Sequence, residues 1–459
     1  MCSLTYWITV KRKKCAELFA HVRILLYLCS GFLTLESNID AISITFQSIK
    51  HMLYKPFKSK DMEQLIADFY RLLERYSAFT QVRYLYDEIH WNDRLILIRG
   101  PKGSGKTTMI MQHIQRTFPD KSKVLYCSVD HLWFASHTLL DLADYAYTHD
   151  ISHLFFDEIH KYKNWSQEIK NIYDSYPGLH VVITGSNALE ITRQKYDLSR
   201  RCLVYTMYGL SFREYLKLEG VADLPVLSLE DIVSNHEKLS IDITIKKNIK
   251  VLLYFERYIK EGYYPFYRDK TTNYLERLSQ VMEAIIFNEM PAVSNLEYES
   301  VYKVKPLLAV LAQQNPYTLN ISALGKTLNA SRNVLLKLID LLDEAALIRR
   351  LYTDDGWAQI NKPEKILFDN TNLMYALSPN ADVGTMRETF CASMLAKGHR
   401  IAMPQKGDLL VDKHLLFEVG GQAKGYKQIA NIPDSYVVTD NTEMSFGNKI
   451  PLWLFGFLY

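Results

Sequence analysis

Eight consecutive residues, Gly100–Thr107, have the spacing of a loop that binds phosphate groups. Their sequence, Gly-Pro-Lys-Gly-Ser-Gly-Lys-Thr, fits the pattern GxxxxGK[ST] at every position. Glycines let successive backbone N–H groups turn toward phosphates, and the N-terminus of the following helix adds partial positive charge. Lys106 is expected to neutralise the β- and γ-phosphates, and Thr107 to place its hydroxyl on Mg²⁺. We therefore expect ATP and Mg²⁺ to bind through Gly100, Pro101, Lys102, Gly103, Ser104, Gly105, Lys106, Thr107 and Thr108.

Two carboxylates follow an apolar run further along the chain. His153–Phe156 leads directly into Asp157 and Glu158. Because ligands gather at the carboxyl ends of parallel strands, this strand would deliver both side chains to the phosphate loop. Asp157 is expected to hold the Mg²⁺ shell with Thr107, and Glu158 to orient or deprotonate the attacking water. A solvated strand end is the alternative, but the preceding phosphate loop favours the catalytic interpretation.

Polar residues follow another apolar run, Val181–Thr184. Ser186 or Asn187 would place a polar group near the γ-phosphate and the water, although Gly-Ser-Asn also suits a turn. We favour Asn187, because its amide both donates and accepts hydrogen bonds. Arg200 and Arg201 come next, and a guanidinium from a neighbouring subunit suits the charge of a transferring phosphoryl group. The alternative for these two residues is a surface arginine pair.

The elements that must position these residues alternate along the chain. A helix is predicted from Met62 through Tyr76, and short apolar runs with helical stretches between them indicate βαβ units and a parallel sheet. The predicted fold class is α/β, with strands at Arg94–Arg99, Val124–Val129, His153–Phe156 and His180–Thr184.

Long, mostly helical segments are predicted after about residue 210, at Ile241–Lys260, Asn273–Glu289 and Val304–Gln314. A helix at Ile321–Leu328, a turn at Asn329–Ala330, a helix at Ser331–Ala345 and a strand at Leu347–Leu351 follow the layout of a winged helix-turn-helix. Lys326, Arg332, Arg349 and Arg350 are candidates for contacts with DNA phosphates. Lys337 is basic too, but Asp340, Asp343 and Glu344 interrupt the basic stripe that a DNA-reading helix usually carries.

The order of these segments resembles a prokaryotic family of AAA-type ATPases whose members carry a C-terminal domain of unknown function. The resemblance rests on GPKGSGKTT, HLFFDEIHKYKNW, VVITGSNALEI and SRRCLVYTMYGLSFREYL, of which LSFREYL is the more specific part. It implies that Arg200 or Arg201 is the arginine finger and that Ser186–Asn187 occupies the sensor position. A second sensor arginine is not evident in the helical lid.

The same resemblance supports the winged helix and implies a restriction-endonuclease-like fold after it. In that fold a helix carries an acidic residue, one strand carries Asp, and the next carries Glu-x-Lys. The matching positions here are Glu388, Asp408 and Glu418, but Gly420 stands where the lysine belongs and Lys424 is the nearest substitute. Without that lysine, nuclease chemistry loses the positive charge that stabilises its developing negative charge. A degenerate nuclease site is therefore expected.

Length and composition indicate several domains in a globular protein. The chain has 459 residues, 48% of them hydrophobic, and a net charge of only +3, which neither requires nor excludes a nucleic-acid partner. KRKK and the apolar segment after it imitate a signal peptide, but no cleavage site follows and the apolar run is too short to span a bilayer. We expect translation to start at Met52 or Met62, no stable membrane insertion and a cytoplasmic location; a membrane tether is the alternative.

The expected organisation has five parts. Residues 1–61 are an uncertain extension, 62–215 an AAA-type ATPase core, 216–314 a helical lid, 315–354 the winged helix-turn-helix, and 355–459 the degenerate restriction-endonuclease-like domain. The leading hypothesis is a switch or motor that hydrolyses ATP to act on an unknown partner. An arginine finger supplied in trans would require a homo-oligomer. The rivals are a nucleotide-gated binding module with negligible turnover and an ATP-regulated DNA nuclease of a defence system or mobile element.

Overall fold

The computed structural model describes residues 59–186, 198, 200–269, 273–291, 298–313, 320–354 and 363–459. The chain divides into two compact units, residues 1–64 and residues 65–459, and the account below concerns the second unit. Residues 1–58, which make up most of the predicted extension and include the proposed start Met52, lie outside the described residues, and so does Asn187. In the described part of the chain, every helix is too short or too polar to cross a membrane.

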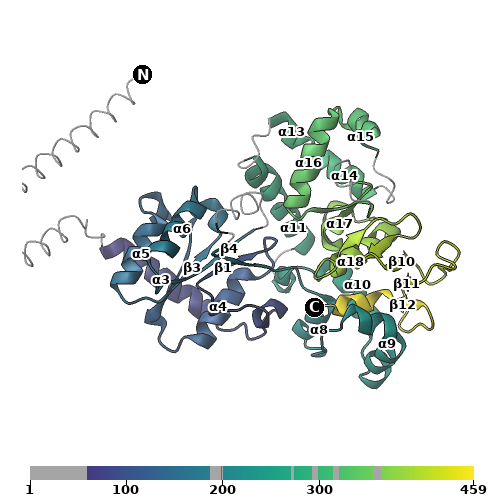
Figure 1. Cartoon of the computed structure of the whole chain (residues 1–459), viewed down its shortest axis with the longest axis horizontal. Helices are drawn as coiled ribbons and strands as arrows, with labels where there is room; N and C mark the ends of the chain where they lie inside the picture. The colour runs from purple at the N-terminus through teal and green to yellow at the C-terminus, as the bar shows by residue number, and fades with distance from the viewer. Residues whose placement is uncertain are drawn as a thin grey trace, which may run out of the picture. The chain divides into compact units, whose positions relative to one another are not determined.

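A five-stranded sheet forms the first layer of the unit (Figure 1). The strand order is β2-β3-β4-β1-β5, and every neighbouring pair is parallel. Near-continuous runs of Val, Ile, Leu and Phe suit strands that are buried on both faces. The sequence predicted four of these strands, and all are confirmed; the bounds are β1 Leu95–Arg99, β2 Val124–Ser128, β3 His153–Asp157, β4 His180–Gly185 and β5 Leu203–Thr206.

Helices cover both faces of this sheet. The chain moves across the sheet in one direction through α4 (Lys106–Thr117) and returns through α5 (Leu139–Thr148) and α6 (Trp165–Ser175). Because parallel crossovers are right-handed, opposite directions of travel place α4 on one face and the other two on the opposite face, as Figure 1 shows. The helix predicted from Met62 to Tyr76 is confirmed as α3 (Ser59–Tyr76).

The next helices run from α8 (Phe212–Leu218) to α11 (Tyr274–Ala284). Ser211 caps α8 through a capping box with Glu214, which fixes where that helix begins. The mostly helical segment predicted at Ile241–Lys260 is confirmed, but it is interrupted. Helix α9 (Leu229–Ile241) passes into a π turn at Asp242–Lys246, and α10 starts only at Val251–Glu261. Asn248, with a φ of 52°, breaks the stretch because a left-handed residue does not continue a helix.

A small group of helices with a two-stranded ribbon follows. Asn329 has a φ of 45° and ends α15, and the Ser331 hydroxyl accepts the Val334 N–H at 3.3 Å to cap α16. The predicted helix, turn, helix and strand are thus present within about one residue. The bounds are α13 Tyr298–Tyr302, α14 Val304–Gln313, α15 Ile321–Leu328, α16 Arg332–Glu344, β6 Ile348–Leu351 and its antiparallel partner β7 Lys365–Phe368.

A second five-stranded sheet, in the order β12-β11-β10-β9-β8, lies in the C-terminal part. Strands β10, β11 and β12 are parallel, whereas β8, β9 and β10 pair antiparallel. Helix α18 packs on β10, and Phe390 on that helix is fully buried. The bounds are α17 Thr371–Leu377, α18 Val383–Leu395, β8 Ile401–Ala402, β9 Leu409–Val411, β10 Leu415–Gly420, β11 Ser435–Thr439, β12 Lys449–Pro451 and a final 3-10 turn, η10, Leu452–Phe457.

Candidate nucleotide site

The loop Gly100–Thr107 joins β1 directly to α4, which is the context that the sequence required. Gly103 and Gly105 have φ values of 85° and 99°, in the left-handed region where side chains with a Cβ are strained. Gly105 is also the N-cap of α4. The loop therefore curls in front of the helix N-terminus, where backbone N–H groups and the helix dipole favour an anion.

Lys106 is buried, with 4% of its surface exposed. Its ammonium group donates to the main-chain oxygens of Gly100 at 2.8 Å and Pro101 at 3.1 Å, so it lies over the loop. Burial lowers the pKa of Lys106, while the nearby charges of Glu158 and Asp157 oppose that change. Within the described residues, the hydroxyl of Ser104 is buried without a hydrogen-bond partner. A buried cation and an unsatisfied hydroxyl on this loop fit a phosphate ligand.

Asp157, at the end of β3, is the centre of a hydroxyl network. Its Oδ2 accepts the Thr107 hydroxyl at 2.6 Å and the Tyr126 hydroxyl at 2.7 Å. Its Oδ1 accepts the Thr184 hydroxyl and the Glu158 N–H, the latter at 3.1 Å. The two predicted magnesium ligands, Thr107 and Asp157, are thus in direct contact. Hydroxyl and carboxylate oxygens are the ligands that Mg²⁺ prefers, so the pair fits this metal.

Glu158 has a φ of 56°, an unusual conformation for a glutamate. Residues held in such conformations cluster at functional sites, where the surrounding structure holds them. Its Oε2 lies 3.6 Å from His160 Nε2 and 3.9 Å from Lys161 Nζ. Among the described residues this buried oxygen has no hydrogen-bond partner. Burial raises the pKa of Glu158, against the opposing charge of Lys106, which makes the carboxylate a stronger base.

Ser186 and His160 stand next to Glu158. The Ser186 hydroxyl lies 3.3 Å from His160 Nε2, and His160 is 8% exposed on the 3-10 turn η4 (Ile159–Lys161). Burial lowers the pKa of His160 to about 4, so its ring is neutral at pH 7. The structure thus brings His160, to which the sequence analysis assigned no role, to the site. Ser186 is the described member of the predicted sensor pair, since Asn187 falls outside the described residues.

Arg200 and Arg201 are not brought to this site within one chain. They precede β5, and β5 runs parallel to β1 with Leu203 opposite Ile96, so both arginines lie at the edge of the sheet opposite the phosphate loop. Arg201 binds Asp174 through two hydrogen bonds of 2.9 and 3.1 Å. Arg200 is exposed. If either residue acts on a nucleotide, that nucleotide belongs to another subunit.

Sequence reasoning missed the buried pair Arg83 and Glu214. Arg83 donates to both carboxylate oxygens of Glu214, at 2.9 and 3.0 Å, and also to the main-chain oxygen of Ser104 in the phosphate loop. Arg83 further donates to Gly209 O at 2.7 Å. The motif LSFREYL contains Glu214 and would have indicated its importance, but no pattern marks Arg83.

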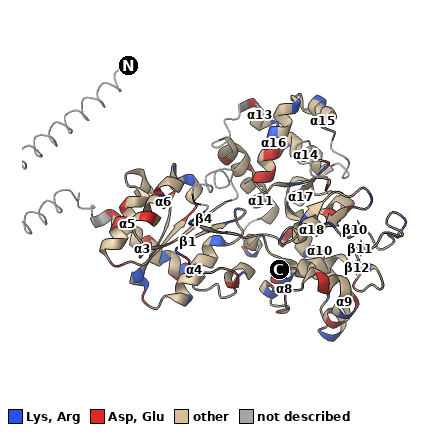
Figure 2. Cartoon of the chain, in the orientation of Figure 1, with Lys and Arg blue, Asp and Glu red and all other residues tan. Residues whose placement is uncertain are grey.

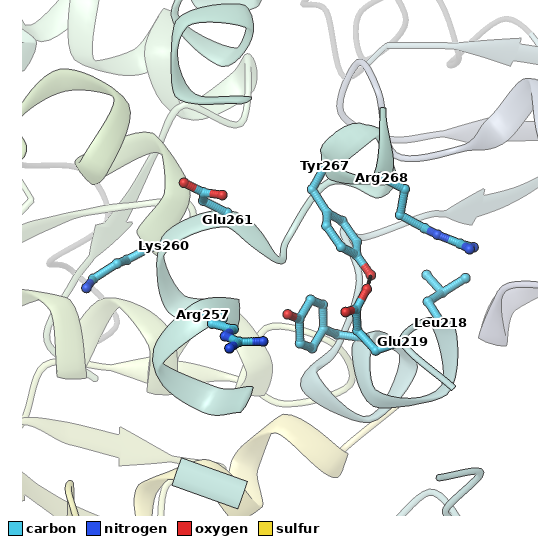
Figure 3. Close-up of a pocket in the computed structure, with 8 residues that line it drawn as sticks. Leu218, Glu219, Arg257, Lys260, Glu261, Tyr267 and Arg268 are labelled. Carbon is cyan, nitrogen blue, oxygen red and sulfur yellow. Dashed lines mark hydrogen bonds between the residues drawn. The ribbon is translucent and has the colours of Figure 1, made fainter. Parts of the chain in front are cut away.

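A short aromatic turn, η7 (Pro265–Arg268), contacts the phosphate loop. A Cβ added to Gly103 would lie 2.8 Å from the Phe266 ring, and one added to Gly105 would lie 3.7 Å from Pro265. The same turn borders a pocket of about 600 Å³ between α8 and α10. Figure 3 shows Tyr267 meeting Glu219 across it, with a hydrogen bond of 2.6 Å. Its lining is mostly polar: Tyr215, Leu218, Glu219, Arg257, Lys260, Glu261, Tyr267 and Arg268.

The candidate nuclease residues do gather in the C-terminal sheet. The Glu388 carboxylate, on α18, is bound by the buried Lys365, and its charge interacts with Asp408 and Glu418. Asp408 accepts the Val419 N–H at 2.7 Å. Glu418 on β10 is bound by Lys424. Lys365, which the sequence did not single out, is thus a second lysine of this cluster.

Gly420 explains how Lys424 reaches Glu418. A Cβ at Gly420 would lie 2.7 Å from the Lys424 Cδ and Cγ atoms. The missing side chain therefore leaves the space through which Lys424 folds back onto the strand. The glycine at position 420 and the contact between Lys424 and Glu418 are therefore linked, because Lys424 occupies the space that a side chain at position 420 would fill.

Two of the four residues expected to contact DNA phosphates, Arg349 and Arg350, are paired with carboxylates of the same chain. Arg349 donates to Asp369 at 2.6 Å, and Arg350 donates to Asp343 at 2.9 Å. Lys326 and Arg332 are exposed. Figure 2 shows residues of both charge signs on α16 and not a continuous basic stripe.

Residues 92–216 match the model of a protein family described as an AAA domain. They span the parallel sheet, the phosphate loop, Asp157 and Glu158. This segment is therefore similar to an AAA domain and carries a loop with the geometry of a phosphate-binding P-loop.

The similarity to one known protein extends beyond that segment. Over 371 residues the chain is 28% identical to an uncharacterized protein of Methanocaldococcus jannaschii, covering 74% of this chain and 78% of the relative. Among solved structures, the Aeropyrum pernix ORC1 protein in complex with DNA matches 68% of this chain and 92% of its own, at 13% identity and a TM-score of 0.30. AMPPCP-bound DnaA from Aquifex aeolicus matches 60% and 86%, at 12% identity and a TM-score of 0.23. Both scores are low, so these two structures say little about the arrangement of this chain.

Proposed function

We propose that the chain hydrolyses ATP at the Gly100–Thr107 site with Mg²⁺ and uses the reaction as a switch or motor on a partner. The observation that carries this proposal is the 2.6 Å contact between Thr107 and Asp157 beside Glu158. A loop that only bound phosphate would need neither carboxylate. With both present, the site has a metal ligand and a base in addition to an anion cradle.

The proposed roles follow from position and charge. Lys106 and the loop N–H groups would hold the phosphates, and Thr107 with Asp157 would hold Mg²⁺, which neutralises charge that develops on the transferring phosphoryl group. Glu158 would accept a proton from the attacking water, helped by the burial that raises its pKa. Ser186 would place its hydroxyl at the γ-phosphate. Asn187 keeps its proposed sensor role from the sequence alone.

The last part of the proposed mechanism is an arginine finger that a second subunit supplies to the nucleotide site. Arg200 is the better candidate, because Arg201 is already held by Asp174 while Arg200 is exposed. Supply in trans requires an oligomer, so we propose that the active form is one. The edge of the sheet that carries these arginines would then face the nucleotide site of the next copy.

The C-terminal half is proposed to present the partner-binding surface. We assign residues 315–354 to a winged helix-turn-helix and residues 355–459 to a restriction-endonuclease-like domain. Helices α15 and α16 with strand β6 support the first assignment, and helix α18 beside strands β9 and β10 supports the second. Nuclease chemistry is not part of the proposal, because Glu388 and Glu418 are each bound by a lysine and Asp408 by a main-chain N–H. This supports a degenerate copy of the fold.

Phosphate release by the full chain tests the proposal, with ATP binding measured in parallel. Lys106→Ala should abolish binding, whereas Glu158→Gln should still bind ATP but release phosphate roughly 10²- to 10⁴-fold more slowly. Glu230→Gln, an exposed residue of α9, is the matched control and should behave as the wild type. Equally slow release by wild type and Glu158→Gln would contradict hydrolysis and leave a nucleotide-gated binding module.

A further inference from the structure

A carboxylate from outside the AAA segment reaches the nucleotide site. Glu289 is the last residue of a π turn, η8 (Ile285–Glu289), that continues α11. Its Oε2 accepts the Ser186 hydroxyl at 3.3 Å, and its Oε1 lies 4.0 Å from Lys102 Nζ. The Glu289 side chain is only 17% exposed. Glu289 thus contacts both Ser186, the residue after β4, and Lys102 of the phosphate loop.

The charge of Glu289 lies among the groups that a triphosphate would use. It interacts electrostatically with Lys106 and Lys161 as well as with Lys102. A terminal phosphate would need the same cations and the same Ser186 hydroxyl. Two anions that share one set of partners in a partly buried site repel each other strongly.

We infer that Glu289 is an anionic latch that contacts Ser186 and Lys102, competes with the γ-phosphate for them and is displaced when ATP binds. The inference rests on the proposed ATP site and adds how that site is regulated. ADP lacks the terminal phosphate, so it displaces the latch less. The position of Glu289 then reports which nucleotide is bound.

The latch is connected to the C-terminal half through α11. At the start of that helix, the Tyr274 hydroxyl donates to Asn372 Oδ1 on α17, which also accepts the Tyr263 N–H at 2.8 Å. The Asn372 amide donates to Ile259 O at 2.8 Å, so α10, α11 and α17 meet at one buried residue. A ligand that favours one position of Glu289 therefore also shifts the equilibrium between positions of α11, the helix that carries Glu289.

Nucleotide affinity of the full chain tests this inference, with Glu289→Gln as the variant that removes the charge and keeps the shape. We expect ATP with Mg²⁺ to bind roughly five- to tenfold more tightly and ADP to change by less than about twofold. Glu276→Gln, an exposed carboxylate on the same helix, is the matched control and should leave both affinities unchanged. Unfolding midpoints of the three proteins report whether each variant folds.

Hydrogen exchange gives a second measurement. In the wild type, ATP should change the protection of α11 and α17 more than ADP does, and Glu289→Gln should remove most of that difference. Weaker ATP binding by Glu289→Gln, or equal changes for ATP and ADP, would overturn the latch. If the wild type binds no ATP, the proposed function fails; if it binds ATP and the variant shows no ATP-selective gain, the latch alone is wrong.

Discussion

Arg83 binds Glu214 through two parallel hydrogen bonds, from Nε to Oε1 at 2.9 Å and from Nη2 to Oε2 at 3.0 Å. Both side chains are less than a tenth exposed. The same guanidinium donates to Ser104 O in the phosphate loop, and Glu214 accepts the Tyr84 N–H at 2.7 Å. One buried ion pair therefore connects Ser104 of the phosphate loop to the start of α8, although Arg83 and Glu214 are far apart in sequence.

Removing one partner of this pair should weaken both the fold and the loop. Arg83→Ala leaves the Glu214 carboxylate buried without its cation, which we expect to lower the free energy of unfolding by about 3–5 kcal/mol. Urea unfolding measures this loss, and ATP titration should give weaker binding because Ser104 loses its support. Arg71→Ala, at a mostly exposed arginine, is the control and should change stability by about 0.5 kcal/mol or less. Equal losses for the two variants would contradict a structural role for the pair.

The two arginines before β5 should differ in their effect on hydrolysis. Arg200→Ala should slow phosphate release by roughly 10³-fold in the assembled protein without changing ATP affinity, because a finger acts on the transition state. Arg201→Ala should mainly break the surface pair with Asp174 and have a small effect.

A mixing experiment tests whether Arg200 acts in trans. Arg200→Ala keeps Glu158, and Glu158→Gln keeps Arg200, so mixed oligomers contain some complete sites. Phosphate release should therefore recover in the mixture relative to either variant alone. No recovery, with mixed oligomers demonstrated, would contradict a finger supplied by a neighbouring subunit.

The C-terminal cluster should make stability depend on pH. Burial raises the pKa of Glu388 from 4.5 to about 7, with Lys365 opposing that change. Between these values the folded state holds more protons than the unfolded state, so stability falls as pH rises through the window. The expected loss for this carboxyl is up to about 3 kcal/mol.

Chemical unfolding at pH 5 and at pH 7.5 measures the pH effect. Glu388→Gln cannot titrate, so its stability should change less between the two pH values than that of the wild type. Glu256→Gln, an exposed carboxylate on α10, should keep the wild-type slope. A slope unchanged in Glu388→Gln would show that other groups cause the dependence.

Local patterns predicted much of the fold. The apolar runs before Gly100, Asp157 and Gly185 became strands because their residues suit a sheet buried on both faces. Local capping likewise placed α15 and α16, since Asn329 and Ser331 act on their own neighbours. The mostly helical segment predicted at Ile241–Lys260 is present, but its apolar pattern did not reveal the break at Asn248, a left-handed residue.

By itself the sequence determined the phosphate loop and the strand that ends in Asp157 and Glu158, because glycine spacing and strand order act over short stretches of chain. Only the tertiary structure decided which distant charges meet. Arg83 with Glu214, Lys365 with Glu388 and Glu289 with Ser186 each join segments that no local pattern relates. Their contacts depend on the packing of helices against sheets, and burial then makes each charge require a partner.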